Sequence, residues 1–242
     1  MSGKPEVSES DDGSLVQLRH VEVAPNLLTT PGDCDLTDII ARHQPLQEHW
    51  SAYIGALPQT GWRTIMRGAD ELGKTTVFAA PLGRDFESWA LIYLYWGERD
   101  SRWIFSADPG PVFWRPSRVT RRQGLGLSWD EDPIATQAGM LPELTISLRN
   151  GADQPWIADT EDGDHVRGWL LDASGHRLSA PSWFGYADGS SVPSLQPGEA
   201  VLLPVTLATE KVENLPPGYY AIEANLIALD LDSDRGSLQI SR

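Results

Sequence analysis

In the stretch Leu144-Thr-Ile-Ser-Leu-Arg-Asn150, apolar and polar side chains alternate from Leu144 to Arg149. Successive side chains of a β-strand point to opposite faces, so the two leucines and the isoleucine would share one face. The threonine, serine and arginine would share the other. One apolar and one polar face are typical of a strand in an antiparallel sheet that covers a core on one side. The stretch therefore predicts a half-buried strand.

Further segments on the C-terminal side of Gly124 have the length and composition of strands and are separated by turn-forming residues. They are Leu125–Trp129, Val166–Asp172, Ala200–Ala208, Tyr219–Leu229 and Ser237–Ser241, with a seventh strand expected near Trp183. Short strands at this spacing are typical of two packed sheets. Residues 123–242 are therefore predicted to form an antiparallel β-sandwich.

Two segments rich in proline and glycine predict how strands of this sandwich are connected. Pro197-Gly198-Glu199 predicts a tight turn, because proline presets φ and glycine permits a positive φ. The spacing of Leu215, Pro217, Gly218 and Tyr220 predicts a tyrosine corner, in which the phenol hydrogen-bonds to backbone a few residues upstream. Both features favour a sandwich.

The same half of the chain resembles a known kind of module. The residues that carry the resemblance are Leu144–Asn150, Trp156, Gly168–Asp172, Gly175, Leu195–Glu199, Leu215–Tyr220 and Leu226. They resemble the immunoglobulin-like accessory domains of bacterial surface-glycan proteins and are also similar to the bacterial intracellular proteinase-inhibitor sandwich. The resemblance implies an immunoglobulin-like fold in a bacterial protein, and it transfers no functional residue.

Residues 15–115 have a different pattern, in which helical periodicity is followed by short strands. Asp35–Leu57 predicts one or two helices divided at Pro45, and Leu15–Val23 predicts a short edge strand. Strands are expected at Trp62–Arg67, Thr75–Ala80, Ser88–Trp96, Arg102–Ala107 and Pro111–Trp114. The clearest hairpin joins Trp89–Trp96 to Arg102–Phe105. We therefore expect a mainly β chain, in which a small α+β domain, an antiparallel meander with one or two helices, precedes the sandwich.

Composition limits the classes of function. The 242 residues carry a formal net charge of -15, which opposes binding to nucleic acids and to anionic membranes. Residues 1–14 are polar and acidic and predict a disordered tail without a signal peptide, and no stretch has the length of a membrane helix. We therefore expect a cytoplasmic protein with no nucleic-acid partner and no membrane insertion. Cys34 is the only cysteine, so an internal disulfide is excluded and a bystander thiol is expected.

The segment Gly68-Ala-Asp-Glu-Leu-Gly73-Lys74-Thr75 fits the phosphate-loop pattern G-x-x-x-x-G-K-[ST]. A phosphate loop must open a helix whose N-terminal amides face the phosphates. Here the chain continues with β-branched and aromatic residues and then Pro81, which favour a strand. We therefore expect a hairpin turn, with nucleotide binding through Gly73, Lys74 and Thr75 as the alternative.

Arg115, Arg118, Arg121 and Arg122 form the only basic cluster of this acidic chain and lie in or beside an Arg-rich connector, residues 116–122. One interpretation is that they pair with acidic loops such as Asp130-Glu131-Asp132 and cap the domain junction. The other is that they bind an anion or an acidic partner, because guanidinium groups match carboxylates and phosphates.

Ten tryptophans are many for a chain of this length, and most of them are expected in the core. Strands such as Trp89–Trp96 place aromatic residues on both faces, so we expect Trp96 or Trp114 to be exposed and available for binding. Asp159–Asp164 and Asp230–Asp234 predict acidic surface loops, with weak calcium binding as the alternative. The five histidines lack the spacing of a zinc pair, and no metal or other cofactor is expected.

These observations lead to one main hypothesis and two alternatives. The sequence predicts a non-catalytic binding or adaptor protein that recognises a protein or glycan partner through an aromatic and arginine surface near the domain junction. That surface would comprise Trp96, Trp114, Arg115, Arg118, Arg121 and Arg122. The alternatives are a nucleotide-binding protein that uses Gly68–Thr75 and an enzyme on an unfamiliar β-rich scaffold.

Overall fold

The computed structural model describes residues 15–45, 47–70, 73–97, 101–140, 142–172, 174–178, 190–207 and 215–242. The chain divides into two compact units, Met1–Ser117 and Arg118–Arg242. The division falls inside the expected connector, so Pro116 belongs to the first unit and Arg118 to the second. The predicted tail, residues 1–14, and the strand expected near Trp183 lie outside the described residues.

The first unit is built on a four-stranded antiparallel sheet. Its strands are β3 (Arg63–Asp70), β4 (Gly73–Pro81), β5 (Ser88–Gly97) and β6 (Arg102–Phe113), and they pair in sequence order. This confirms the predicted meander and the β5–β6 hairpin. One expectation was wrong, because β6 is a single strand where two were expected. β6 contains a bulge opposite Ala90, which accommodates Pro109 and Pro111. β6 is also the edge strand of this sheet, so its outward backbone N–H groups pair with no strand and proline, which has no N–H, is tolerated there.

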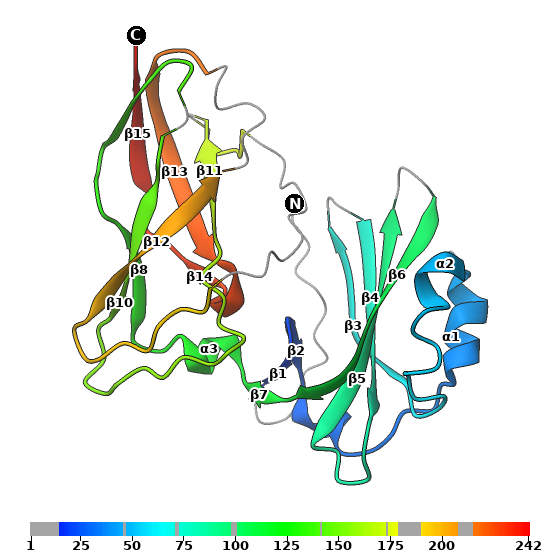
Figure 1. Ribbon diagram of the computed structural model, residues 1–242. Helices are drawn as coiled ribbons and strands as arrows, with labels where there is room; N and C mark the ends of the chain where they lie inside the picture. Colours follow the sequence, from blue (N-terminus) through cyan, green and yellow to red (C-terminus); the bar gives the residue numbers. More distant parts are fainter. Residues whose placement is uncertain are drawn as a thin grey trace. The chain divides into compact units, whose positions relative to one another are not determined.

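Helices cover one face of this sheet (Figure 1). Helix α1 (Leu36–His43) ends at Gln44, which adopts a left-handed conformation, and α2 (Gln47–Trp50) follows Pro45. Leu36 and Ile39 of α1 pack with Trp62 and with the buried apolar residues on this face of β4 and β5. The predicted division at Pro45 is confirmed, but the second helix is only four residues long and continues as turns to Leu57.

A small second sheet covers part of the opposite face. It contains β1 (Val16–Leu18), β2 (Val21–Val23) and β7 (Arg115–Pro116) in the order β2-β1-β7, and the short helix η1 (Pro25–Leu28) follows β2. The single edge strand expected here was wrong, because Arg19 turns the chain with a φ of 52°. The Arg19 Nε–H donates to Asp108 Oδ2 over 2.8 Å, which fixes this turn.

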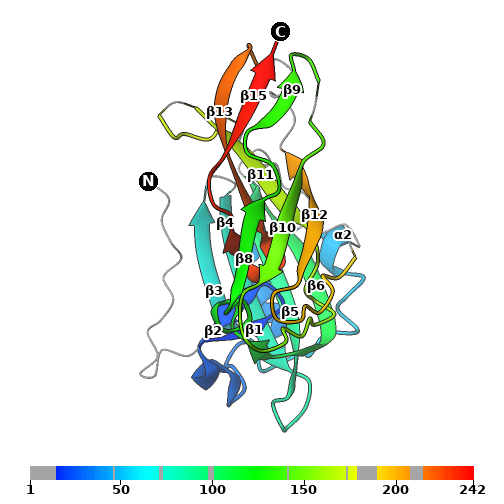
Figure 2. The same cartoon turned by 90° about the vertical axis from the view of Figure 1, so that its left-hand side faces the viewer.

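The second unit is a β-sandwich. Its strands are β8 (Leu125–Trp129), β9 (Ile134–Gln137), β10 (Thr145–Asn150), β11 (Val166–Leu171), β12 (Ala200–Leu207), β13 (Gly218–Leu226), β14 (Leu231–Asp232) and β15 (Gly236–Ser241). They pair in the order β8-β10-β12-β11-β13-β15-β9, and β14 pairs with β13. Figure 2 shows β8 beside β10 and β9 beside β15. Two short helices, α3 (Arg118–Arg121) and η3 (Ile227–Leu229), complete the described elements of this unit.

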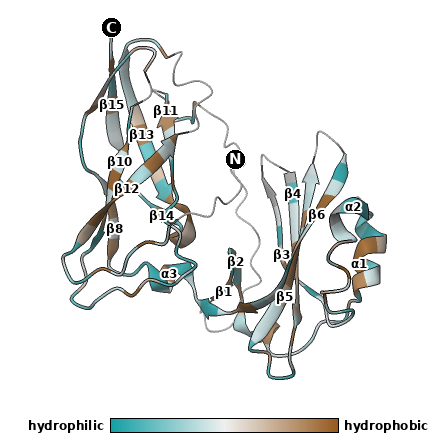
Figure 3. Ribbon diagram, in the orientation of Figure 1, coloured by the Kyte–Doolittle hydropathy of each residue, from teal (hydrophilic) through white to brown (hydrophobic). Residues whose placement is uncertain are grey.

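The core of the sandwich lies between its two layers. Ile146 and Leu148 of β10 pack with Val166 of β11 and with Leu226 of β13. The alternation predicted for Leu144–Asn150 is confirmed, since its apolar residues are buried while Thr145 and Arg149 are exposed. Figure 3 shows both hydrophobic and hydrophilic segments in the strands of this unit. The sequence missed β9, a short strand that pairs parallel to β15.

Both connections predicted for the sandwich are confirmed. Gly198 has a φ of 77°, and the Glu199 N–H donates to the carbonyl of Gln196 over 3.0 Å, which closes the turn. The phenol of Tyr220 donates to the carbonyl of Pro216 over 2.8 Å, as a tyrosine corner requires. No helix in the described part of the chain is long and apolar enough to cross a membrane.

The tyrosine corner gives a direct test of this fold. We predict that Tyr220→Phe lowers the free energy of unfolding of the second unit by about 1 kcal/mol, because it removes only the phenol hydrogen bond. The control is Tyr219→Phe, since Tyr219 is 73% exposed. Urea denaturation of both variants measures the effect. Equal stabilities for the two variants would contradict the predicted corner.

Candidate functional site

The phosphate-loop-like segment lies in the β3–β4 hairpin. Lys74 pairs with Ala69 of β3 and with Trp96 of β5, and Thr75 pairs with Gly68 and Tyr95. The predicted hairpin is confirmed. Gly73, Lys74 and Thr75 open a strand that runs to Pro81, so no helix N-terminus follows them to supply amides to a phosphate.

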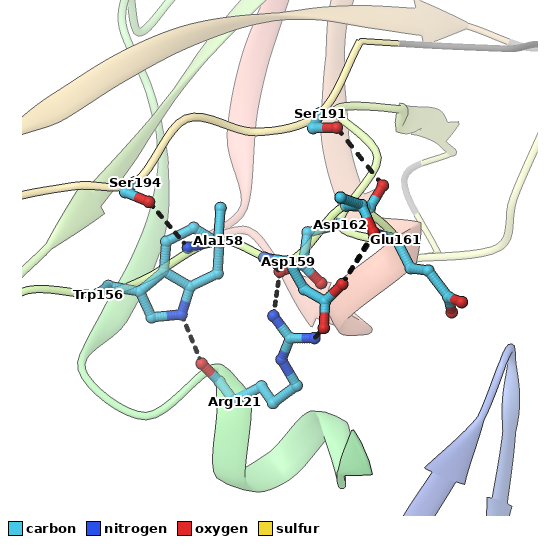
Figure 4. Close-up of polar contacts among 9 residues, drawn as sticks. Arg121, Trp156, Ala158, Asp159, Glu161, Asp162, Ser191 and Ser194 are labelled. Atoms are coloured by element: carbon cyan, nitrogen blue, oxygen red, sulfur yellow. Dashed lines mark hydrogen bonds and ion pairs between the residues drawn. The ribbon is translucent and has the colours of Figure 1, made fainter. Parts of the chain in front are cut away.

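Arg121 is bound inside the second unit (Figure 4). Its side chain is 8% exposed, and its Nη2 pairs with Oδ2 of Asp162, which is fully buried. Its Nη1 lies 3.4 Å from Oδ2 of Asp159. The Asp159 N–H donates to Asp162 Oδ2 over 2.8 Å, so the buried carboxylate has a charged and a neutral donor. Arg121 therefore compensates a buried negative charge of its own unit.

The contacts around Arg121 also hold the acidic loop of residues 159–164. Trp156 donates its indole N–H to the Arg121 carbonyl over 2.7 Å, and the Ala158 N–H donates to Ser194 Oγ over 3.0 Å. The expectation of a purely surface loop was wrong for Asp162. Its carboxylate tolerates burial because Arg121 neutralises it.

Arg122 binds a different part of the same unit. Its Nη1 donates to the carbonyls of Leu229 and Asp230 and lies 3.6 Å from Asp230 Oδ2. The guanidinium therefore satisfies carbonyls at the C-terminal end of η3. The loop Asp130-Glu131-Asp132 was expected to pair with these arginines. Its Asp132 instead accepts a hydrogen bond at Oδ1 from the Ser237 N–H over 2.9 Å.

The other two arginines of the predicted cluster lie in separate units. Arg115 is 8% exposed and belongs to β7 of the first unit. Arg118 is half-buried at the start of α3 in the second unit. Helix α3 and its C-terminal end carry Arg118, Arg121 and Arg122. Arg121 and Arg122 bind carboxylates and carbonyls of the second unit itself.

The buried ion pair makes a strong prediction for stability. Arg121→Met should destabilise the second unit by about 3–5 kcal/mol, because it leaves the Asp162 carboxylate buried without its cation. Arg122→Met should cost about 1 kcal/mol or less, since the Arg122 side chain is 30% exposed.

Guanidinium chloride denaturation measures both variants. The double variant Arg121→Met/Asp162→Leu should recover part of the loss, because it removes both charges from the interior. An Arg121→Met protein as stable as the Arg122→Met protein would refute the structural role of this pair.

The two predicted tryptophans have different surroundings. Trp96 is half-buried at the end of β5 and makes an edge-on contact with Trp103, with ring centroids 5.4 Å apart. Trp103 contacts the ring of His43 in the same way at 5.1 Å. Trp114 is 51% exposed, which confirms that at least one of the two predicted tryptophans lies at the surface.

Trp114 follows a second exposed aromatic residue that the sequence analysis did not single out. Phe113 is 60% exposed, whereas its neighbour Val112 is buried, as is Arg115 after Trp114. The sequence could have revealed the exposure of Phe113, because successive side chains of a strand point to opposite faces and an inward Val112 places Phe113 outward. Leu82 is also exposed and lies at the same end of the sheet. Its backbone N–H donates to the carbonyl of Ser88 over 2.9 Å, and Ser88 is the cross-strand neighbour of Phe113. We call Leu82, Phe113 and Trp114 the apolar end.

Cys34 is a free and half-buried thiol in the first unit. Burial, together with the nearby carboxylate of Asp33, raises the pKa of Cys34 above its ordinary value. Its Sγ lies 3.6 Å from Asp33 Oδ1. A thiol that stays protonated at neutral pH is a weak nucleophile, which agrees with a bystander role.

The second unit contains a polar pocket that the sequence analysis missed. Its cavity volume is about 210 Å³, and it is lined by Trp169, Arg177, Glu223, Ala224, Asp232 and Ser233. Trp169 of β11 and Glu223 of β13 are directly paired across the two strands. The only sequence signal was a large aromatic residue at an outward position of β11, between the inward-facing Gly168 and Leu170.

The lining residues of this pocket are held by a set of short contacts. The Arg177 guanidinium lies 4.0 Å from the centroid of the Trp169 ring. Glu223 Oε1 accepts from Arg235 Nη2 over 2.8 Å, and Asp232 Oδ1 accepts from Asn225 Nδ2 over 2.8 Å. The Trp169 side chain is almost completely buried, and its indole N–H has no acceptor among the described residues.

A hydrogen-bonded loop carries Arg177 to the pocket. Asp172 Oδ1 accepts from the Ser174 N–H over 2.8 Å, from the Ser174 hydroxyl over 2.6 Å and from the His176 N–H over 2.9 Å. The Ser174 side chain contributes most to lowering the pKa of Asp172, and the His176 backbone adds to it. The charged carboxylate therefore fixes the residues that immediately precede Arg177.

This loop should respond to pH in a defined direction. The pKa of Asp172 is lower in the folded chain than its ordinary value of 3.8, so the bonds of its carboxylate persist above that value and are lost as the pH falls through the folded pKa.

NMR can follow the amide signals of Ser174 and His176 during an acid titration. We predict that their transition has a midpoint below 3.8 and that Asp172→Asn abolishes it. A midpoint at or above the ordinary value would contradict the hydrogen bonds of this loop.

In the described ranges of the chain, no group of three or more His, Cys, Asp or Glu side chains is placed to hold a metal ion. The chain was also compared with known proteins. No protein-family model, no curated protein and no solved structure matches it.

Proposed function

We propose that the chain is a non-catalytic binding or adaptor protein that recognises a partner protein through the apolar end of its first unit. The observation that carries this proposal is the exposure of two consecutive aromatic side chains, 60% for Phe113 and 51% for Trp114. Large aromatic residues dominate the energy of protein interfaces because they bury much apolar area with few rotatable bonds.

The local backbone supports this role. Val112 and Arg115, on either side of the exposed pair, are 1% and 8% exposed, so both ends of the aromatic segment are anchored in the unit. Phe113 is also paired with Ser88 across β5 and β6. An anchored backbone lowers the conformational entropy that is lost when the side chains bind.

A protein partner is favoured over a glycan at this place. Phe113 has no hydrogen-bonding group, and the third member of the apolar end, Leu82, has none either. Sugar hydroxyls need polar partners, whereas an apolar protein surface does not. The net charge of -15 further favours a partner with a basic surface, because complementary charge accelerates association.

The second unit completes the proposed adaptor as an immunoglobulin-like module. Support comes from the tyrosine corner of Tyr220 and from the first strands, since β8 pairs with β10 while β9 pairs in parallel with β15. Arg121 and Arg122 serve the stability of this module in the proposal. We further propose a bacterial cytoplasmic protein, in agreement with the resemblance of this half and with the single cysteine.

Site-specific crosslinking tests the proposed interface. A photo-crosslinking amino acid is placed at Phe113 or at Trp114, and at Tyr219 of the second unit as a control that is more exposed than either. In cells that naturally contain the chain, we expect the first two positions to yield the same protein adduct and the control to lack it.

The adduct is then identified by mass spectrometry and its binding is measured with purified components. Trp114→Ser should weaken this binding by about 2 kcal/mol, roughly 30-fold, while Tyr219→Ser leaves it unchanged. The proposal fails if all three positions give the same adducts or if Trp114→Ser binds as tightly as the natural chain.

A further inference from the structure

We propose that the pocket between β11 and β13 of the second unit binds a neutral polyhydroxylated ligand, namely a single sugar ring of a saccharide. Its lining residues are Trp169, Arg177, Glu223, Ala224, Asp232 and Ser233. This site lies in the second unit and requires no protein partner, so it stands independently of the apolar end.

The first observation is a buried donor without an acceptor. Trp169 is 7% exposed, and its indole Nε1–H has no hydrogen-bond partner among the described residues. Native proteins satisfy nearly all buried donors with protein atoms, water or a ligand. Trp169 lines the pocket, and we infer that an acceptor atom of a ligand held there satisfies this donor.

The second observation is the mixture of charges on the pocket wall. Arg177 lies against the Trp169 ring, whereas Glu223 and Asp232 contribute carboxylates. An anion would meet the two carboxylates and a cation would meet the guanidinium. An apolar ligand would bury these groups without partners. A neutral ligand that both donates and accepts hydrogen bonds fits all of them.

The carboxylates keep free acceptor capacity for such a ligand. Glu223 accepts from Arg235 only through Oε1, and Asp232 accepts from Asn225 only through Oδ1. Each carboxylate oxygen has two lone pairs, so both side chains can accept further bonds. Ser233 Oγ accepts from the Ala224 N–H over 2.9 Å, which leaves its hydroxyl proton to donate. Neighbouring hydroxyl groups on a sugar ring present this alternation of donors and acceptors.

The size of the cavity limits the ligand to one ring. Pockets for drug-sized molecules measure roughly 300–1,000 Å³. The cavity here has a volume of about 210 Å³. The walls are also set before binding, because Asp172 orders the loop that carries Arg177 and Arg235 holds Glu223.

NMR of the full chain with nitrogen-15-labelled tryptophan tests the site. The probes are the neutral sugars glucose, galactose, mannose and N-acetylglucosamine, with gluconate and glucosamine as the anionic and cationic counterparts of glucose. Trp169→Phe assigns the Trp169 indole signal by its disappearance. We expect at least one neutral sugar to shift this signal saturably at millimolar concentration, while the signals of Trp62 and Trp89 in the first unit stay in place.

Matched variants separate recognition from folding. Glu223→Gln keeps the size of the side chain but loses its charge and should weaken the binding of that sugar at least fivefold, as followed by the Trp169 signal. Trp169→Phe keeps the ring beneath Arg177 and should weaken binding at least tenfold, as measured by calorimetry. Trp103→Phe, in the first unit, should bind as the natural chain does. Thermal denaturation verifies that each variant is folded.

Three results would overturn the proposal. The first is the absence of any shift of the Trp169 signal up to a sugar concentration on the order of 100 mM, well above the millimolar range. The second is stronger binding of gluconate or glucosamine than of every neutral sugar. The third is unchanged binding by a folded Glu223→Gln protein. If the apolar end fails its own crosslinking test, the expectation for this pocket does not change.

Discussion

The ion pair between Arg121 and Asp162 is the contact on which the second unit most depends. Asp162 is fully buried, so its charge requires a cation at this place. Arg121 supplies it from α3, and the carbonyl of the same residue accepts from Trp156. One residue thus joins the helix that opens the unit, the acidic loop and a core tryptophan. The sandwich is therefore complete only with α3 attached.

The sequence was sufficient to predict those features of the sandwich that depend on residues close together in the chain. The alternation in Leu144–Asn150, the turn at Gly198 and the corner at Tyr220 were all predicted, because each is determined by neighbouring residues. Strand β9 was missed because its four residues pair with β15, a strand far away in the sequence. The hairpin at Arg19 was missed because a positive φ at a residue other than glycine has no sequence signal.

The candidate sites were harder to predict, because their chemistry depends on pairs of distant residues. Arg121 suggested an anion site in the sequence, but its partner Asp162 lies 41 residues away and uses the guanidinium internally. The pocket around Trp169 combines residues of β11, β13 and β14 with the loop of Arg177, and the cross-strand register brings them together. Of the apolar end, the sequence named only Trp114, as one of two tryptophans of which at least one was expected at the surface because strands here carry aromatic residues on both faces.

The position of β15 has a consequence for how the chain folds while it is synthesised. This strand follows all other described strands in the sequence, yet it lies between β13 and β9 in the sheet. While the ribosome makes the second unit, β9 has no neighbour until β15 emerges. The first unit differs, because β3 to β6 pair in the order in which they are made. The low contact order of this four-stranded sheet allows it to form early, whereas the sandwich must wait for its last strand.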